Sequence, residues 1–268
     1  MNKKEYNLFC FLGQSLQHGV ANANPTNVQN DANDNEIIEF RTDQRNYGKP
    51  TLDRLRNNTL SSGETLSDRF SPANAFARRM YQVHGLRNIV IAVMAFGGHG
   101  ITRFLDPSRR LVTPADSGID RYDECIDFID GVERNLKHGG SDVNFRGFVW
   151  WQGSSDGANQ NLKDNYQTHL ERVVSDYRTN TNIGSSDSKW LIARSPQGGT
   201  NSNWPAAGDK RHRAQETVGT NDLNAAWTSV DNPLGTTNVF SDGTHPDASS
   251  TERIGTVMAD AWVSSFGV

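Results

Sequence analysis

The segment FSDGTHPDA, residues 240–248, holds a carboxylate and an imidazole three positions apart. On a turn that contains glycine, Asp242 can reach Nδ1 of His245 while Nε2 faces outward. Such an imidazole can take the proton of a serine nucleophile in acyl transfer, a reaction that also needs donors for the developing oxyanion. Taken alone, the pair is more often a turn aspartate and a surface histidine ahead of a helix. The interpretation therefore depends on finding the serine.

Ser155 is one candidate nucleophile, because Gly153–Gly157 fits G-x-S-x-G, the spacing of a nucleophile elbow. An elbow must lead directly into a buried helix, whereas residues 158–165 are polar on most sides. An elbow enzyme also usually places its acid well before its histidine, and here the two are neighbours. The pattern arises easily by chance where glycine and serine are common.

Ser15 is the better candidate. It follows the apolar run Tyr6–Leu12 in FLGQSLQHG, where Gly13 permits a sharp turn that exposes the hydroxyl. A buried strand that ends in such a turn presents the serine at the edge of a sheet.

The elements that must position these residues alternate between strand and helix. Continuous apolar runs predict strands at 88–96, 145–151 and 189–193, with a weaker one at 36–40. Helical periodicity predicts helices over 73–83 and 122–136, from Leu162, and from about Pro246. Strands apolar on both faces belong to parallel sheets covered on both sides. We expect one domain, residues 1–268, with an α/β fold: a three-layer α/β/α sandwich around a mainly parallel, flavodoxin-like sheet of about five strands.

Three of the apolar runs end in small or polar residues, namely Gly13–Ser15, Gly97–His99 and Gln152–Gly153. Ligands of open α/β sheets bind at the carboxyl ends of the strands. We therefore expect these three segments to meet at one site.

Four segments, GQSLQHG, AFGGHGITRF, WWQGSSD and DGTHP, occur in this order between residues 13 and 246, and the late RHRAQ forms a weaker fifth. They resemble the motif blocks of the SGNH hydrolases, most closely the branch with sialate O-acetylesterases and acetylxylan esterases. The resemblance implies a catalytic serine, base and orienting acid at Ser15, His245 and Asp242. It implies oxyanion donors at the Ser15 amide, the Gly98 amide (Gly97 is the alternative) and the Gln152 side chain.

The chain departs from the branch at three positions. Ser154 stands where the branch usually has Glu, His99 where a small hydroxyl residue is common, and Phe104 where Trp is common. The first puts in doubt how the nucleophile turn is braced, and the others bear on acyl or sugar preference. Candidate substrate contacts are Gln14, His18, His99 and Trp204. The alternative for Trp204 is a loop anchor packed on the domain surface. For His18, a loop histidine without a role fits equally well.

The implied function is a serine esterase, a carboxylic ester hydrolase that removes O-acetyl groups from a carbohydrate through an acyl-enzyme. The alternatives are a lipid or thioester hydrolase on the same fold and a non-catalytic carbohydrate-binding module. A net charge of −4 argues against nucleic acid as a partner, and the basic cluster at 210–213 is interpreted as a solvated helix face. We expect no cofactor and no metal, since His169 suits a packed core and the other histidines lack ligand spacing.

Two cysteines are too few for a disulfide framework, and Cys10 suits a buried thiol. The apolar part of the N-terminus, residues 8–12, is too short for a convincing signal peptide, and no stretch reaches transmembrane length. We expect no membrane partner, and either a cytoplasmic protein or a part of a larger exported or virion assembly.

Overall fold

Seven strands form one sheet in the order β3-β2-β4-β1-β5-β6-β7 within the described residues. The computed structural model describes residues 3–18, 37–41, 51–54, 71–112, 120–194, 209–231 and 245–268. The strands are β1 (Glu5–Gln14), β2 (Ile37–Arg41), β3 (Thr51–Arg54), β4 (Ile89–Phe96), β5 (Asp142–Trp151), β6 (Lys189–Arg194) and β7 (Ala225–Ser229). The helices are α1 (Ser15–His18), α2 (Pro72–Gln82), α3 (Tyr122–His138), α4 (Gln160–Asn180), α5 (Lys210–Asn221) and α6 (Ala248–Phe266), with short 3-10 turns η3 (Ile101–Phe104) and η4 (Pro107–Arg109).

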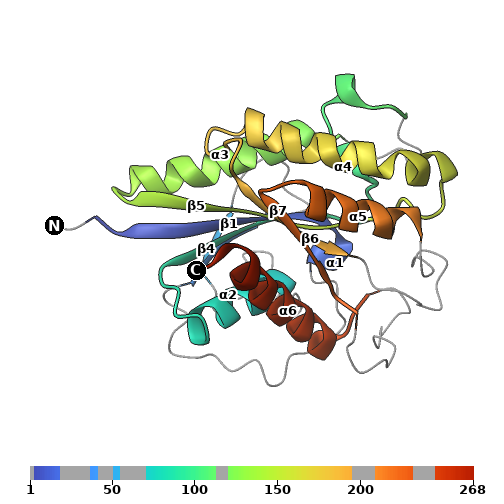
Figure 1. Ribbon diagram of the computed structural model, residues 1–268. Coiled ribbons are helices and arrows are strands. Elements are labelled where there is room, and N and C mark those ends of the chain that lie inside the picture. The colour runs from blue at the N-terminus through green and yellow to red at the C-terminus, as the bar shows by residue number, and fades with distance from the viewer. Residues whose placement is uncertain are drawn as a thin grey trace, which may run out of the picture.

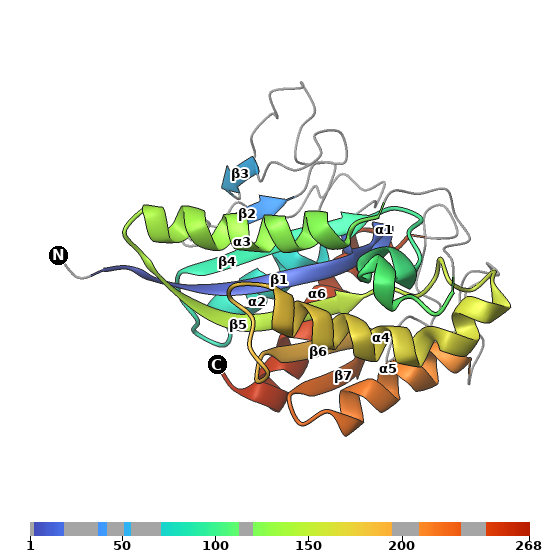
Figure 2. The same cartoon turned by 90° about the horizontal axis from the view of Figure 1, so that it is seen from above.

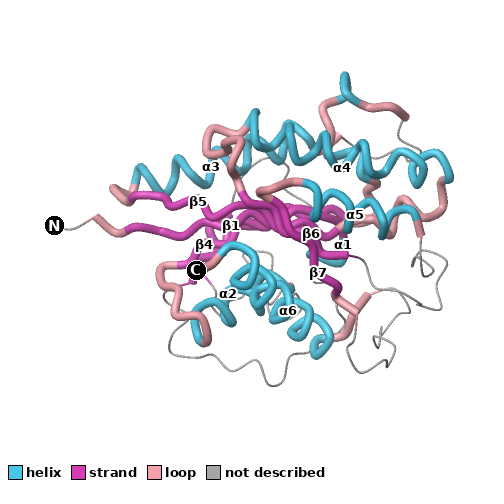
Figure 3. Tube along the Cα trace, in the orientation of Figure 1, coloured by secondary structure: helices cyan, strands magenta, loops and turns pink. Residues whose placement is uncertain are grey.

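The sheet is parallel except at one edge, where β3 pairs antiparallel with β2. Helices cover both faces, α3, α4 and α5 on one and α2 and α6 on the other (Figures 1 and 3). The predicted α/β/α sandwich with a mainly parallel sheet is confirmed.

The alternation of β1 shows how the sequence supplies two separate cores. Phe9 packs edge-on against Phe76 of α2 and Trp262 of α6, with ring centroids 5.1 Å apart in each case. Cys10 and Leu12 belong to the core cluster on the opposite face. Because both faces are covered, β1 must be apolar in consecutive positions, and this produces the continuous run in the sequence.

The strands that were predicted begin or end within a few residues of their expected bounds, and two others were missed. The sheet has β3 and β7 in addition to the about five strands expected. Both are short edge strands, and β7 is only partly buried along its length. None of the helices in the described part of the chain has the length and hydropathy that a membrane crossing requires.

The central strands bring their carboxyl ends together. In the parallel register, Gln14 pairs with Phe96 of β4 and Gly13 pairs with Trp151 of β5. Strands β4 and β2 lie on one side of β1, and β5, β6 and β7 lie on the other (Figure 2). The residues that follow β1, β4 and β5 therefore share one edge, at the point where the chain order diverges from β1.

Candidate active site

Ser15 and His245 meet at this edge of the sheet. Ser15 is the first residue of α1, directly after β1, and His245 lies just before α6. The Ser15 Oγ and His245 Nε2 atoms are 2.8 Å apart, across 230 positions of sequence, and both residues are half-buried. A hydroxyl at hydrogen-bond distance from an imidazole is the geometry that a nucleophile and its general base require.

The third member of the expected set, Asp242, lies outside the described residues, as does Trp204. His18 closes α1, and its side chain is likewise outside the description. The structure therefore brings together two of the three expected catalytic residues and leaves the position of the carboxylate a prediction.

The glycine turn after β4 is held by His99. Gly98 has φ +73°, in the left-handed region that favours glycine, and a Cβ there would meet nothing within 4 Å. His99 Nδ1 lies 2.8 Å from the carbonyl oxygen of Gly97, and its Nε2 accepts a hydrogen bond of 3.4 Å from Nε of Arg121. Because the arginine can only donate, the imidazole proton belongs on Nδ1. His99, expected to contact substrate, thus also fixes the turn that carries Gly98.

Gln152, expected to donate to the oxyanion, is fully buried and bonded within the protein. Its Nε2 donates to the carbonyl oxygen of His99 at 3.1 Å and to Oδ2 of Asp156. Its Oε1 accepts from the Tyr166 hydroxyl at 2.9 Å, and burial raises the pKa of that hydroxyl, which keeps it a donor. Both amide hydrogens therefore bind protein acceptors. This arrangement differs from the expected one, because Asp156, four residues on, and the carbonyl oxygen of His99 occupy both amide hydrogens.

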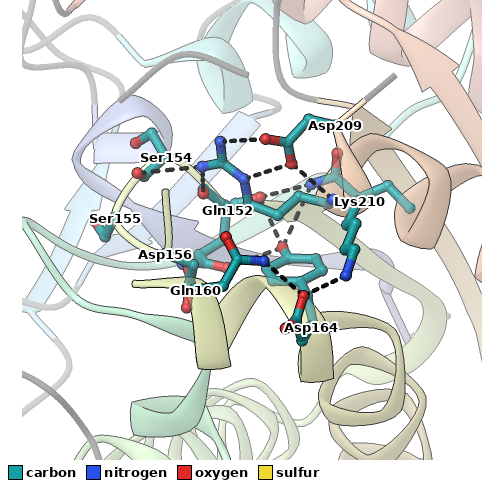
Figure 4. A network of polar contacts seen from close by, with 12 residues as sticks. Gln152, Ser154, Ser155, Asp156, Gln160, Asp164, Asp209 and Lys210 are labelled. Carbon is teal, nitrogen blue, oxygen red and sulfur yellow. Dashed lines mark hydrogen bonds and ion pairs between the residues drawn. The ribbon is translucent and has the colours of Figure 1, made fainter. Parts of the chain in front are cut away.

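Asp156 extends the same connection to the η3 turn. It is fully buried, and its Oδ1 accepts from the amide of Ile101 at 3.0 Å. Figure 4 shows Gln152 and Asp156 in this network. The segments that follow β4 and β5 are consequently tied together directly beneath the glycine turn.

Gln14 differs from the expected substrate contact for a similar reason. Its side chain is buried, and its Oε1 accepts from the amides of Gly153 at 3.2 Å and Ser155 at 3.3 Å. Its Nε2 donates to Oγ of Ser154, the serine that stands where the branch usually has Glu. Gln14 is thus part of the framework that joins the nucleophile turn to the segment after β5.

The geometry at Ser155 does not favour the elbow interpretation. Its hydroxyl lies 3.4 Å from Oε1 of Gln14, while the imidazole of His245 lies against Ser15. The next helix, α4, begins only at Gln160, so the serine does not lead directly into a helix as an elbow requires.

Sequence reasoning missed Arg211, whose buried guanidinium bonds to the segment after β5. The interpretation of residues 210–213 as a solvated helix face was wrong at two positions, since Arg211 and His212 are each only 2% exposed. Arg211 donates from Nη1 to the carbonyl oxygen of Gly153 at 2.6 Å. Spacing could have revealed it, because Arg211, Gln215 and Val218 recur at helical intervals on one buried face of α5.

Gln215, on the same face, donates from Nε2 to the carbonyl oxygen of Gln152 at 2.7 Å. His169 is a packed core histidine, as expected, whose Nε2 accepts from the amide of Leu111 at 3.2 Å. The described residues contain no group of three or more His, Cys, Asp or Glu side chains that could hold a metal ion.

Comparison with known proteins places this chain in a family. The family model for carbohydrate esterases, sialic acid-specific acetylesterases, matches residues 5–264. A search of curated proteins gives no match.

Solved structures share the fold at low sequence identity. A protein from Arabidopsis thaliana aligns with a TM-score of 0.65 and 18% identity, over 97% of this chain and 98% of its own. A carbohydrate acetylesterase from Xanthomonas citri aligns with a TM-score of 0.65 and 14% identity, over 97% of this chain and 56% of its own. NanS aligns with a TM-score of 0.63 and 14% identity, over 98% of this chain and 96% of its own.

Proposed function

Since the chain belongs to the family of sialic acid-specific carbohydrate acetylesterases, which are carboxylic ester hydrolases, we propose that it removes O-acetyl groups from a carbohydrate with Ser15 as nucleophile. The observation that carries the proposal is the 2.8 Å contact between Ser15 Oγ and His245 Nε2. It joins two residues at the carboxyl edge of the sheet, where open α/β folds bind their ligands.

In the first half of the reaction, Ser15 Oγ adds to the acetyl carbonyl carbon while His245 Nε2 takes the hydroxyl proton. Asp242 orients the imidazole from its Nδ1 side. Collapse of the tetrahedral intermediate expels the sugar oxygen, which receives the proton from His245, and leaves Ser15 acetylated. In the second half, His245 takes a proton from water as the water oxygen attacks the acetyl-serine. The tetrahedral intermediate then collapses, His245 returns the proton to Ser15 Oγ, and acetate leaves.

The oxyanion of each tetrahedral intermediate is held by the backbone amides of Ser15 and Gly98. The exposed glycine turn supports this assignment, since its positive φ lets a backbone amide be presented without a side chain in the way. Gln152 supports the oxyanion site by holding the carbonyl of His99, directly after Gly98. Its own amide can serve as a third donor only if it gives up one of its two protein acceptors.

Two serine variants test the proposal. Ser15→Ala should lower turnover of p-nitrophenyl acetate by at least about 10³-fold, because the acyl acceptor is gone. Ser155→Ala is the matched control, since it removes a nearby hydroxyl with only a long hydrogen bond, and it should stay within about threefold of the unmodified protein. An active Ser15→Ala together with an inactive Ser155→Ala would restore the elbow interpretation.

The substrate class is tested by following acetate release from O-acetylated sialic acid and from acetylated xylan, beside esters of increasing acyl length. A carbohydrate deacetylase should prefer the acetyl group and lose activity as the acyl chain grows. Preference for long acyl chains would instead indicate a lipid or thioester hydrolase.

A further inference from the structure

Arg211 and Asp209 form an ion pair at the start of α5, in which Arg211 is buried and Asp209 is partly buried. Asp209 is the N-cap of the helix, and its Oδ1 accepts from both the backbone amide and Nε of Arg211 at 2.9 Å. Its Oδ2 accepts from Nη2 at 3.1 Å. Two side-chain bonds and a backbone cap therefore hold the guanidinium in one orientation.

The guanidinium also forms hydrogen bonds with the segment that follows β5. Besides the 2.6 Å bond to the carbonyl oxygen of Gly153, Nη1 lies 3.4 Å from the carbonyl oxygen of Ser154. Gly157 passes so close that a Cβ there would lie 2.5 Å from Nη1. The arginine thus fills the space within the bend that residues 153–157 make.

Gln14 also bonds to this bend. The amides of Gly153 and Ser155 donate to Gln14 Oε1, and Ser154 Oγ accepts from Gln14 Nε2. Gln14 is covalently bonded to Ser15, so the orientation of its side chain constrains the backbone on which the nucleophile stands. Polar contacts lead from the ion pair through Gly153 to Gln14, and a peptide bond joins Gln14 to Ser15. Figure 4 shows Asp209 and Ser154 in the part of this connection around the ion pair.

We propose that Arg211, held by Asp209, is a positioning residue that sets the backbone of Ser15 through the 153–155 segment and Gln14. The proposal rests on the function proposed above. Arg211 bonds to Asp209 and to the carbonyl oxygens of Gly153 and Ser154, so its effect on Ser15 is exerted through the backbone. A displacement of about 1 Å at a reacting group can cost on the order of 10²-fold in rate, and a buried bidentate pair resists such displacement.

Electrostatics is consistent with a permanent pair. Burial by itself would raise the pKa of Asp209, but the hydrogen bonds and charge of Arg211 outweigh burial and hold the pKa below its ordinary value. Asp209 therefore stays ionised at neutral pH, and its removal would take the carboxylate partner away from a buried guanidinium.

The chain contains a matched control pair of the same construction. Arg178 bonds to Asp222 through Nη1 at 2.5 Å and Nη2 at 3.3 Å, and also donates to the carbonyl oxygens of Ser188 and Asn224. Ser188 and Asn224 immediately precede β6 and β7, at the end of the sheet opposite to Ser15. Loss of this pair should cost stability without touching the site.

The test compares Arg211→Met with Arg178→Met. Each variant is measured for melting temperature, for kcat and KM with p-nitrophenyl acetate, and for the rate at which a fluorophosphonate labels Ser15. Arg211→Met should lower both kcat and the labelling rate about 10- to 100-fold with KM within about twofold, because positioning acts on the reacting atoms. Arg178→Met should lower the melting temperature and leave kcat within about twofold.

Conservative variants keep the proposal testable if Arg211→Met does not fold. Arg211→Lys retains the charge but loses the fork that spans Asp209 and Gly153, and it should recover only part of kcat. Asp209→Asn weakens the clamp while the arginine remains, and it should lower kcat about threefold or more. Full activity in both variants, or equal loss of kcat in the Arg211 and Arg178 variants, would overturn the proposal.

Ser15→Ala in the same assays separates this proposal from the proposed function. If Ser15→Ala stays active, the assignment of the nucleophile fails and the positioning role fails with it. If Ser15→Ala is inactive while the Arg211 variants match the unmodified protein, only the positioning role is overturned.

Discussion

Gln152 is the residue on which most of the polar contacts beneath the site converge. Its side chain and carbonyl oxygen join His99, Asp156, Tyr166 and Gln215, which lie on four different segments of the chain. A buried amide is costly unless each of its polar groups is matched. A fully matched buried amide therefore gives the turn after β4 a single orientation relative to β5.

Removal of the Tyr166 hydroxyl tests this role. Tyr166→Phe takes the donor from Gln152 Oε1, while the carbonyl oxygen of Gln152 keeps its bond to Gln215. One buried acceptor is then unmatched, so we expect the free energy of unfolding to fall by about 1–3 kcal/mol. The measurement is urea denaturation, with kcat followed in parallel because the carbonyl of His99 depends on the same amide.

Tyr177→Phe provides the control. Tyr177 is fully buried in the same core, and the partner of its hydroxyl is the thiol of Cys125, a weak hydrogen-bonding group. Its removal should lower the free energy of unfolding less than Tyr166→Phe does, since only a weak bond to a thiol is lost. Equal destabilisation by the two variants would show that packing, and not the bond to Gln152, accounts for the effect.

At the scale of elements, the close approach of β1 and β5 sets the position of the nucleophile. A Cβ added to Gly13 would overlap the carbonyl oxygen of Trp151, so the two backbones could not keep their present register. Glycine is required here for space. The strand that carries Ser15 at its end is thereby held against the strand that leads into Gln152.

Gly13→Ala should therefore affect both stability and catalysis. We expect a loss of at least about 2 kcal/mol in the free energy of unfolding, because backbone atoms must separate to admit the methyl group. Ester turnover should fall as well, since the shift occurs two residues before Ser15. Denaturant unfolding and kcat with an acetate ester measure the two effects.

Gly139→Ala is the comparison for this substitution. Gly139 caps α3 with φ −71°, a conformation open to any residue, and its added Cβ would lie 3.3 Å from the carbonyl oxygen of Leu136. It should change stability by less than about 1 kcal/mol and leave turnover intact. If both alanine variants behave alike, the contact between β1 and β5 is not what constrains the site.

The elements that the sequence predicted are those whose pattern is imposed by burial on both faces. Strands β1, β4 and β5 are continuous apolar runs because helices cover each side of the sheet. Strand β7 escaped prediction because only part of its surface is buried, so AAWTS carries no such run. Strand β3, TLDR, is a four-residue edge strand whose sequence carries no apolar run either.

The candidate site divides in a similar way. Ser15 and His245 were predicted because chemistry restricts the residue types that can serve as nucleophile and base. The roles of Gln14 and Arg211 depend on partners 139 and 58 positions away, and no local spacing encodes those contacts. The only sequence signal for Arg211 is the helical spacing of the residues on the buried face of α5.

For the molecule as a whole, buried histidines link stability to pH. Burial, followed by the charge of Arg172, lowers the pKa of His169 from 6.5 to about 4, and burial also lowers the pKa of His212. The folded protein therefore holds both imidazoles in the neutral form at pH values where the unfolded chain binds protons. The contribution of His169 to stability is complete above about pH 6.5 and is lost as the pH falls toward 4, and that of His212 changes in the same direction.

The variant His169→Gln should reduce this acid sensitivity. The glutamine oxygen can accept the hydrogen bond that the Leu111 amide now donates to Nε2, and it does not titrate. Between pH 6.5 and 4.5, we expect the unmodified protein to lose on the order of 2 kcal/mol more than His169→Gln does. Urea unfolding at half-unit pH steps measures the difference, with His138→Gln, at an exposed histidine, as the control. Parallel pH profiles for all three proteins would show that the acid sensitivity comes from other groups.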